Sequence, residues 1–281
     1  MSSARPALPL ADLLAFYAEA GVDEALEEQG VDRLARPQER TVATEAPPAP
    51  PRPKPPKPGP QVKAAVPEEG QVALARELAR AAQTLEELRA AMQAFEGCNL
   101  RLTAKQLVFA DGKPGADLML VGEAPGRDED IEGLPFVGRS GRLLDRMLAA
   151  IGRDRTSAYI ANVIPWRPPG NRTPTPIETE ICRPFIERQI ELVNPKVLVT
   201  LGAPSARTLL RTTEAITRLR GNWRLHLTPS GAEIPAMPTL HPAYLLRTPA
   251  HKKLAWRDFL AVKARLAGSP RPGSSPADSM P

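Results

Sequence analysis

The sequence predicts an α/β fold, a three-layer α/β/α sandwich with a central, mainly parallel four-stranded sheet. Four short apolar runs have the length of buried parallel strands, and segments with helical patterning alternate with them along the chain. The predicted strands are 117–122, 158–164, 197–202 and 236–240, and the predicted helices are 139–152, 176–193, 203–212 and 251–267. This alternation is typical of a parallel sheet covered by helices on both faces.

A further helix is predicted ahead of the first strand, from Gln71 to Phe95. The segment is rich in Ala, Leu, Glu and Arg, which favour helix, and its apolar residues recur at helical spacing. The apolar stripe consists of Leu74, Leu78, Ala82, Leu85, Leu88 and Met92. We interpret the segment as the first helix of the globular domain.

Proline and charge divide the chain into four predicted parts. Residues 1–35 contain a short amphipathic acidic segment, and residues 36–68 include the run APPAPPRPKPPKPGP. Such a run favours extended polyproline conformation and predicts a semi-rigid linker. The globular domain is expected to span 69–267, and the composition of 268–281 predicts a disordered tail.

The formal net charge of +5 is unevenly distributed along the chain. Residues 1–30 hold one basic and six acidic side chains, a local charge of −5, so the remaining 251 residues carry +10. This excess favours a polyanionic partner, although a solvated basic surface without a partner has the same composition. The acidic segment on its linker suits recruitment by a protein partner or docking on the basic part of the chain.

Composition argues against several classes of protein. No apolar run is long enough to cross a membrane and no signal peptide is recognisable, so we expect a protein of a bacterial-type cytosol. We also expect it to be a monomer. Cys98 and Cys182 are the two cysteines, too few for a disulfide framework or for a metal site of cysteine alone. The three histidines, His226, His241 and His251, are too scattered for a zinc cluster.

Polar residues mark the ends of the predicted strands. Glu123 in the run GEAPG (122–126) follows the first strand, Asn162 lies in the second, and His241 begins the run HPAYLLR after the fourth. Ligands of open parallel sheets bind beyond the carboxyl ends of the strands. Convergence of these segments on one cleft is a stronger indication than a single Gly-rich turn, which is most often structural.

These runs, together with PFVGRSG (135–141) and NVIPWRPPGNRTPTP (162–176), resemble the motifs of family 4 uracil-DNA glycosylases, the thermostable iron–sulfur type. The resemblance covers about residues 95–265. It implies a monofunctional enzyme of base excision repair that flips deoxyuridine out of DNA and hydrolyses the N-glycosidic bond. Its product would be an abasic site, and its partner would be uracil-containing DNA.

The resemblance implies roles for three pocket residues. Phe136 would be the platform on which the extruded uracil stacks, although a phenylalanine is otherwise an ordinary core residue. Asn162 would offer its amide NH2 to uracil O4 and its carbonyl to N3–H, a pattern that cytosine reverses. His241 would donate a hydrogen bond to uracil O2 as negative charge builds on the departing base.

Two glutamates and an alanine complete the predicted pocket. Many uracil glycosylases outside this family orient the attacking water with an aspartate, but here the residue after Glu123 is Ala124. We therefore expect backbone groups of residues 123–126 to position the water and Glu123 to bond within the pocket. Glu129 corresponds by spacing to the family residue that crowds the uracil C5 edge. Both glutamates are alternatively surface or capping groups, because RDED (127–130) is a solvated charge run.

Loops near the pocket supply the predicted DNA contacts. Arg167 and Arg172 lie in a basic loop that its prolines stiffen. Such a loop can bind phosphate with little loss of conformational entropy. Leu245, Leu246 and Arg247 follow the predicted catalytic histidine and are candidates to wedge into the space that the flipped base vacates. The alternative for them is a first helical turn that packs inward.

Two of the four cluster positions of family 4 are substituted. The four positions read Cys98, Arg101, Trp166 and Cys182. A four-iron cluster normally takes four thiolates, so we expect no iron–sulfur cluster and no other cofactor. Trp166 and the stem of Arg101 would fill the space instead.

Two other functions are compatible with these residues. A non-catalytic or single-turnover uracil-DNA binding protein would account for the missing aspartate and the missing cysteines, and measured turnover separates it from an enzyme. A phosphate- or nucleotide-binding enzyme that uses GEAPG would need a basic residue inside the turn, and none is present.

Overall fold

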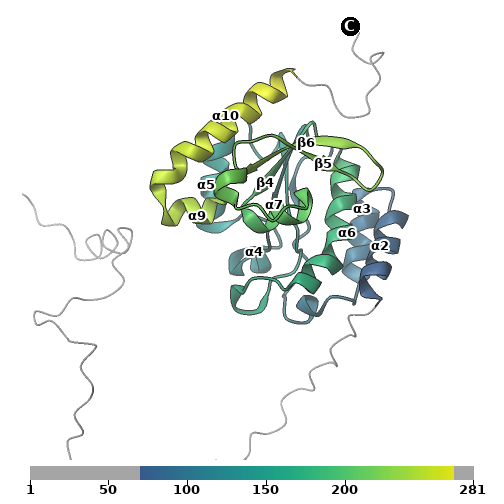
Figure 1. The fold of residues 1–281 in the computed structure, drawn as a ribbon. Coiled ribbons are helices and arrows are strands. Elements are labelled where there is room, and N and C mark those ends of the chain that lie inside the picture. Colours follow the sequence, from purple (N-terminus) through teal and green to yellow (C-terminus); the bar gives the residue numbers. More distant parts are fainter. Residues whose placement is uncertain (1–69, 269–281) are drawn as a thin grey trace, which may run out of the picture. The chain divides into compact units, whose positions relative to one another are not determined.

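The computed structural model describes residues 70–268 (Figure 1). The predicted acidic segment (1–35), linker (36–68) and all but the first residue of the tail (268–281) lie outside the described residues, and the proposed domain boundaries stay predictions. No helix in the described part of the chain is long and apolar enough to cross a membrane.

A six-stranded sheet with the order β1-β3-β2-β4-β6-β5 forms the centre. The strands are β1 (Asp111–Gly112), β2 (Leu118–Gly122), β3 (Ala158–Asn162), β4 (Val197–Leu201), β5 (Arg224–Leu227) and β6 (Glu233–Thr239). β3, β2, β4 and β6 are parallel neighbours, whereas β1 and β5 pair antiparallel at the edges.

The α/β class is confirmed, but the predicted number of four strands was wrong. The two additional strands lie at the edges and lack the signal of a buried strand. β1 has two residues, and in β5 His226 is buried whereas Leu225 and Leu227 are exposed. An edge strand packs on fewer neighbours, so an apolar run of normal length is not required there.

Helices cover both faces of the sheet. They are α2 (Gln71–Ala81), α3 (Leu85–Ala94), α4 (Arg127–Glu132), α5 (Gly138–Ala149), α6 (Pro176–Val193), α7 (Ala203–Leu210), α8 (Ile216–Leu219), α9 (Pro242–Arg247) and α10 (Lys252–Gly268). Short 3-10 turns occur at Asn99–Leu102, Pro169–Asn171 and Pro249–His251. α5, α9 and α10 lie on one side of the sheet, and α2, α3 and α6 lie on the other (Figure 1).

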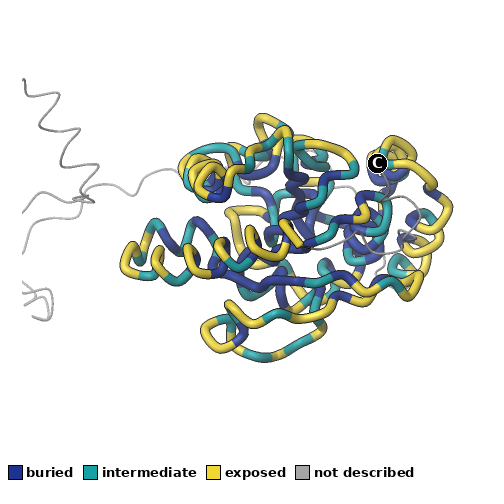
Figure 2. Tube along the Cα trace, turned by 90° about the horizontal axis from the view of Figure 1, so that it is seen from above, coloured by how far each residue is buried: buried dark blue, intermediate teal, exposed yellow. Residues whose placement is uncertain are grey.

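Alternation along β2 explains the three layers. Leu118 and Leu120 pack in a core cluster with residues of α5 and α10, whereas Met119 and Val121 pack in a second cluster with residues of α2, α3 and α6. Successive side chains of a strand point to opposite faces, so a strand buried on both faces is apolar at every position. The central segments are correspondingly buried, while the helices alternate between buried and exposed residues (Figure 2).

The single helix predicted for Gln71–Phe95 is two helices. α2 ends before Ala82, whose backbone is extended, and Thr84 caps α3 by accepting a hydrogen bond from the Glu87 amide at 3.1 Å. Arg188 of α6 donates to the Ala82 carbonyl at 2.8 and 2.9 Å. Ser/Thr followed three residues later by Glu is a helix-start signal, and here it outweighs a continuous apolar stripe.

Candidate active site

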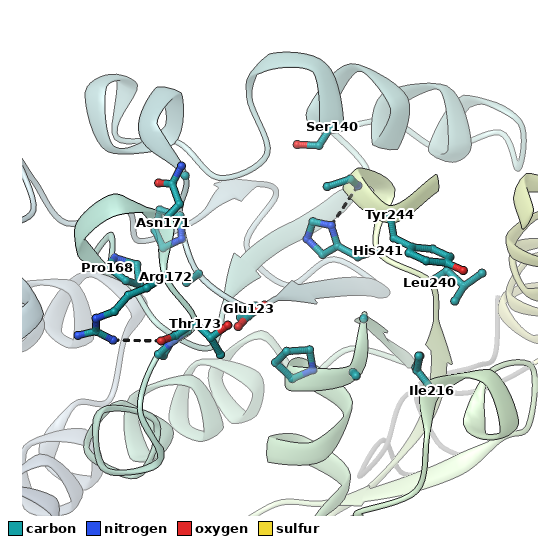
Figure 3. Close-up of a pocket in the computed structure, with 18 of the residues that line it drawn as sticks. Glu123, Ser140, Pro168, Asn171, Arg172, Thr173, Ile216, Leu240, His241 and Tyr244 are labelled. Atoms are coloured by element: carbon teal, nitrogen blue, oxygen red, sulfur yellow. Dashed lines mark hydrogen bonds between the residues drawn. The ribbon is translucent and has the colours of Figure 1, made fainter. Parts of the chain in front are cut away.

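A cavity of about 700 Å³ opens at the carboxyl ends of the parallel strands (Figure 3). Its lining includes the turn 123–126 after β2, the loop that follows β3, residues 202–204 after β4, and His241 after β6. Of the residues predicted from the sequence, Glu123, Ala124, Glu129, Arg172, His241 and Arg247 line this cavity. Segments more than a hundred residues apart are brought together because the parallel strands all end at the same edge.

Phe136 and Asn162 lie beside the cavity in a buried group. Phe136 is 3% exposed and Asn162 is 6% exposed. The ring centroids of Phe136 and His241 are 5.4 Å apart, with a tilt of 30°. A Cβ atom on Gly122 would overlap Asn162 Oδ1 and would lie 2.6 Å from Phe136 Cζ. A glycine at the end of β2 therefore gives both side chains the space that they occupy.

His241 is held as the N-cap of α9. Its Nδ1 accepts a hydrogen bond from the Ala243 amide at 3.1 Å, and this leaves the ring proton on Nε2 in the neutral form. Burial, and secondarily the charge of Arg247, lowers the pKa of His241 to about 4. The imidazole is therefore neutral at neutral pH, with Nε2–H as a donor already oriented by the helix cap.

Gly202 gives His241 the space that it occupies. Gly202 follows β4 with a φ angle of +94°, and a Cβ atom there would lie 3.1 Å from His241 Cβ. A side chain at this position would meet both an unfavourable backbone conformation and the catalytic candidate. No functional residue was predicted at the end of the third parallel strand, although ligands of open parallel sheets bind beyond the carboxyl end of every such strand.

The two predicted carboxylates have different environments. Burial raises the pKa of Glu123 and of Glu129 above the ordinary value for glutamate. Glu129 also accepts a hydrogen bond from the Gly126 amide at 3.0 Å, which caps α4. The capping alternative thus describes one role of Glu129, while its side chain also forms part of the cavity lining.

The turn after β2 is fixed by continued pairing with the chain beyond β3. The Gly122 carbonyl accepts from the Val163 amide at 3.0 Å, and the Glu123 carbonyl accepts from the Ile164 amide at 2.9 Å. These bonds hold the Glu123–Gly126 turn next to Asn162. The carbonyl groups of Gly122 and Glu123 are thereby hydrogen-bonded to the chain that follows β3.

The two loop arginines are ion-paired within the protein. Arg172 donates to both carboxylate oxygens of Glu178, at 2.6 and 2.9 Å. Arg167 donates to Asn171 Oδ1 at 2.7 Å and lies 3.8 Å from a carboxylate oxygen of the buried Asp130. Both guanidinium groups therefore stiffen the loop, and Arg172 does so at the wall of the cavity.

The residues after His241 divide between core and surface. Leu245 is 1% exposed and packs with Leu240 and Ala255, so the inward-packing alternative describes Leu245. Leu246 is partly exposed, and Arg247 is exposed and lines the cavity. A helical turn necessarily points its successive side chains in different directions, so the three residues do not share one face.

Other residues that line the cavity were not predicted from the sequence. They include Ser140, Asn171 and Tyr244 (Figure 3). Tyr244 shares a hydrogen bond of 2.7 Å between its hydroxyl and His251 Nδ1. All three lie within the runs quoted for the motifs, but their residue types alone carry no signal for a pocket position.

Cys98 and Cys182 are buried, with their Sγ atoms 3.9 Å apart. Trp166 is 2% exposed and stacks on Phe95, with ring centroids 6.4 Å apart. Arg101 instead donates to the Gln93 carbonyl at 3.0 Å, near the surface. Within residues 70–268 no group of three or more His, Cys, Asp or Glu side chains is arranged to hold a metal ion.

Comparison with known proteins identifies one family across most of the domain. Residues 109–260 match the model of the uracil DNA glycosylase superfamily. The chain is 37% identical to a type-4 uracil-DNA glycosylase of Sulfurisphaera tokodaii over 67% of this chain and 87% of the relative. It is 36% identical to the type-4 enzyme of Archaeoglobus fulgidus over 68% of this chain and 96% of the relative. Identity to the type-4 enzyme of Thermotoga maritima is 42%, over 53% and 77% of the two chains.

These relatives contradict the prediction of a chain without a cofactor. Type-4 enzymes are the iron–sulfur class, and the chain is 36% to 42% identical to them. The substitution of two cysteines therefore does not by itself exclude a cluster, and the inference from the cysteine count was wrong. The two thiols of Cys98 and Cys182 do not match the usual set of four thiolates, so no step of the chemistry is assigned to a cluster.

Proposed function

This chain belongs to the uracil-DNA glycosylase superfamily and is a uracil-DNA glycosylase of DNA repair, and from that premise we propose that the cavity at the ends of β2, β3, β4 and β6 is its uracil pocket. The observation that carries the proposal is the grouping of Phe136, Asn162 and His241 at one place. The ring of Phe136 is 5.4 Å from that of His241, and Phe136 and Asn162 both pack against Gly122.

Recognition in this proposal rests on a ring and an amide. The extruded uracil stacks on Phe136, and Asn162 pairs with O4 and N3–H of its edge. Asn162 is nearly buried, so a cytosine would leave the amide mispaired away from water. Such mispairing costs about 1–3 kcal/mol for each unsatisfied group, which favours uracil.

Bond cleavage rests on His241. Water attacks C1′ of the sugar as the C1′–N1 bond breaks, and the electron pair of that bond leaves with uracil; the water loses its proton to solvent, and the released uracil anion takes up a proton from solvent. The Nε2–H of the neutral imidazole donates to O2, where the negative charge accumulates. Because the cap of α9 fixes the ring beforehand, little reorganisation is needed when this charge develops.

The two glutamates act at the edges of the pocket. Backbone groups of the turn 123–126 position the attacking water, since Ala124 has no polar side chain, and Glu123 bonds within the pocket. Glu129, held by its bond to the Gly126 amide, crowds the C5 edge against the methyl group of thymine. A carboxylate fixed by a cap is rigid enough to exclude a methyl group.

DNA binding in the proposal uses the walls of the cavity. Arg247 and the loop of Arg167 and Arg172 approach phosphates around the flipped nucleotide. Leu246 and Arg247 are the better wedge candidates, because Leu245 is committed to the core. The partner of this surface is uracil-containing DNA.

Turnover on uracil-containing oligonucleotides tests the proposal. We expect many abasic sites per protein molecule, from single- and double-stranded substrates assayed in parallel. Release of no more than one uracil per protein would instead support the single-turnover binding protein. Strand cleavage at the abasic site without added base would contradict the monofunctional chemistry.

The low pKa of His241 predicts a specific dependence of stability on pH. The pKa of His241 in the folded chain is about 4, below the ordinary value of 6.5. As the pH falls from 6.5 to 4, the histidine therefore takes up a proton in the unfolded chain while it stays neutral in the folded chain. Stability from the neutral imidazole is therefore present above about pH 6.5 and is lost as the pH falls towards 4. Between pH 7 and 4.5, wild type should lose about 2 to 3 kcal/mol more stability than His241→Asn, measured by urea unfolding.

Asparagine is the appropriate comparison because it is a good N-cap and does not titrate. The other titrating groups, including Glu123 and Glu129, are common to both proteins and cancel in the difference. Equal losses of stability in the two proteins would show that His241 has an ordinary pKa.

A further inference from the structure

Phe136 has an unusual backbone conformation for a bulky residue. Its φ angle is +53°, in the left-handed region that L-residues other than Gly, Asn and Asp rarely adopt. Such a conformation is unfavourable and persists only where the surrounding structure holds it. Because the backbone fixes the direction of the Cα–Cβ bond, this conformation determines where the ring points.

One side chain, Arg155, holds two carbonyl groups of this segment. Its Nη2 donates to the Phe136 carbonyl at 2.5 Å, and its Nη1 donates to the Pro135 carbonyl at 3.1 Å. The guanidinium is itself fixed by two carboxylates, Asp111 of β1 at 2.5 Å and Asp145 of α5 at 2.8 Å. Arg155 thus ties the backbone of the PFVG run to a strand and a helix.

Helix α5 fits closely around the same carbonyl. A Cβ atom on Gly141 would overlap the carbonyl oxygen of Phe136. The oxygen is therefore enclosed by the backbone of α5 as well as by Nη2 of Arg155. A rotation of this peptide would break the Arg155 bond and press the oxygen against the helix.

The ring end of Phe136 has equally close neighbours. Phe136 Cζ would lie 2.6 Å from a Cβ atom on Gly122, and the ring is 5.4 Å from that of His241. A change of backbone conformation at Phe136 would move the ring relative to both. The residue that fixes the backbone therefore fixes the stacking surface.

We propose that Arg155 is a positioning residue for uracil excision, which holds the Pro135 and Phe136 carbonyls so that the ring of Phe136 presents its face to the base. This inference rests on the proposed stacking role of Phe136. Among the described residues that line the cavity, Arg155 is not found. It acts through Phe136 and not on the substrate.

A double-mutant cycle in the full chain tests the proposal. Arg155→Lys should lower the single-turnover excision rate by about tenfold to a hundredfold, because a lysine ammonium cannot replace the planar fork and small misplacements are costly. Phe136→Ala should also be slow. The double variant should be no slower than Phe136→Ala alone, because without the ring there is nothing to position. Affinity for uracil-free DNA should be the same in all four proteins.

Three outcomes would overturn the inference. Losses that multiply in the double variant would mean that Arg155 acts on something other than the ring. A wild-type rate for Arg155→Lys would mean that the two carbonyl bonds are unnecessary. A wild-type rate for Phe136→Ala would refute the stacking role first, and the inference with it, so the two failures are distinguishable.

Asp145→Asn is the matched control, because it removes a partner of Nε and leaves both carbonyl bonds in place. Asp145 is half exposed, so the rate should change by less than about twofold. A loss equal to that of Arg155→Lys would overturn the inference in favour of a general charge effect. If Arg155→Lys does not fold, Arg155→Gln, which is too short to keep both carbonyl bonds, takes its place in the cycle with Phe136→Ala, and the same two patterns of rates decide.

Discussion

Replacement of His241 by alanine is expected to slow uracil excision by about a hundredfold to a thousandfold, the usual effect of removing one oriented donor to a developing anion. The physical reason is the preorganisation of the imidazole, whose Nδ1 is engaged by the Ala243 amide while Nε2–H remains to donate. Activity should not vanish, because stacking and edge recognition remain. The measurement is the single-turnover rate on a uracil-containing oligonucleotide.

The experiment with His241→Ala needs a control, because His241 also caps α9. His241→Ala removes the cap as well as the donor, and loss of an N-cap typically costs about 1 kcal/mol of stability. His241→Asn keeps a capping side chain but is too short to supply a donor where Nε2 lies. It should therefore recover stability without recovering the rate. Recovery of both would mean that His241 serves only the helix, and an unchanged rate in either variant would remove His241 from the mechanism.

Asn162→Asp is expected to cost about a hundredfold or more in the rate of uracil excision. The change is nearly isosteric at a position that is 6% exposed, so packing is retained while the amide donor is lost. Uracil O4 would then face an acceptor, and two mispaired groups at about 1–3 kcal/mol each span the free energy of about 2.7 kcal/mol that corresponds to a hundredfold loss of rate. A protonated carboxyl matches the edge of cytosine, so slow cytosine excision should appear in this variant.

Two substrates and a second variant, Asn162→Ala, distinguish a loss of base recognition from a loss of folding. Excision should be measured on uracil- and cytosine-containing oligonucleotides, with thermal unfolding of each variant. Asn162→Ala should lose uracil excision and gain none on cytosine. A well-folded Asn162→Asp or Asn162→Ala protein with wild-type uracil turnover would refute the role of Asn162.

The parallel part of the fold was predictable because its signals are local. β2, β3, β4 and β6 are short apolar runs, and α6 begins where Thr175 and Glu178 form a capping box around Pro176. The short helices α4 and α8 were not predicted, and a helical turn in α9 was only the alternative to the wedge, because four to six residues show no helical period. Their existence depends on tertiary contacts and on caps such as His241.

The site was predictable to the extent that it follows strand ends. Glu123 and His241 lie at the cavity and Asn162 lies beside it, as the strand-end argument predicted. The positive φ angle of Phe136 and the clamp of Arg155 were not predictable, since both depend on carbonyl groups brought together only in the folded chain. Gly202 directly follows β4, so a pocket position there was predictable from the strand end.

The order of strands in the sheet places the residues proposed for base recognition and the residue proposed for bond cleavage in two different halves of the sheet. The side chains that we propose to read the base, Phe136 and Asn162, belong to the half formed around β2 and β3, whereas His241, the proposed donor to O2, belongs to the half formed by β4, β6 and β5. In this proposal, substitutions can therefore alter bond cleavage without changing the residues that recognise the base. A descendant that loses the imidazole would keep a uracil reader, and the same separation offers a route to a probe that marks uracil in DNA and leaves it intact.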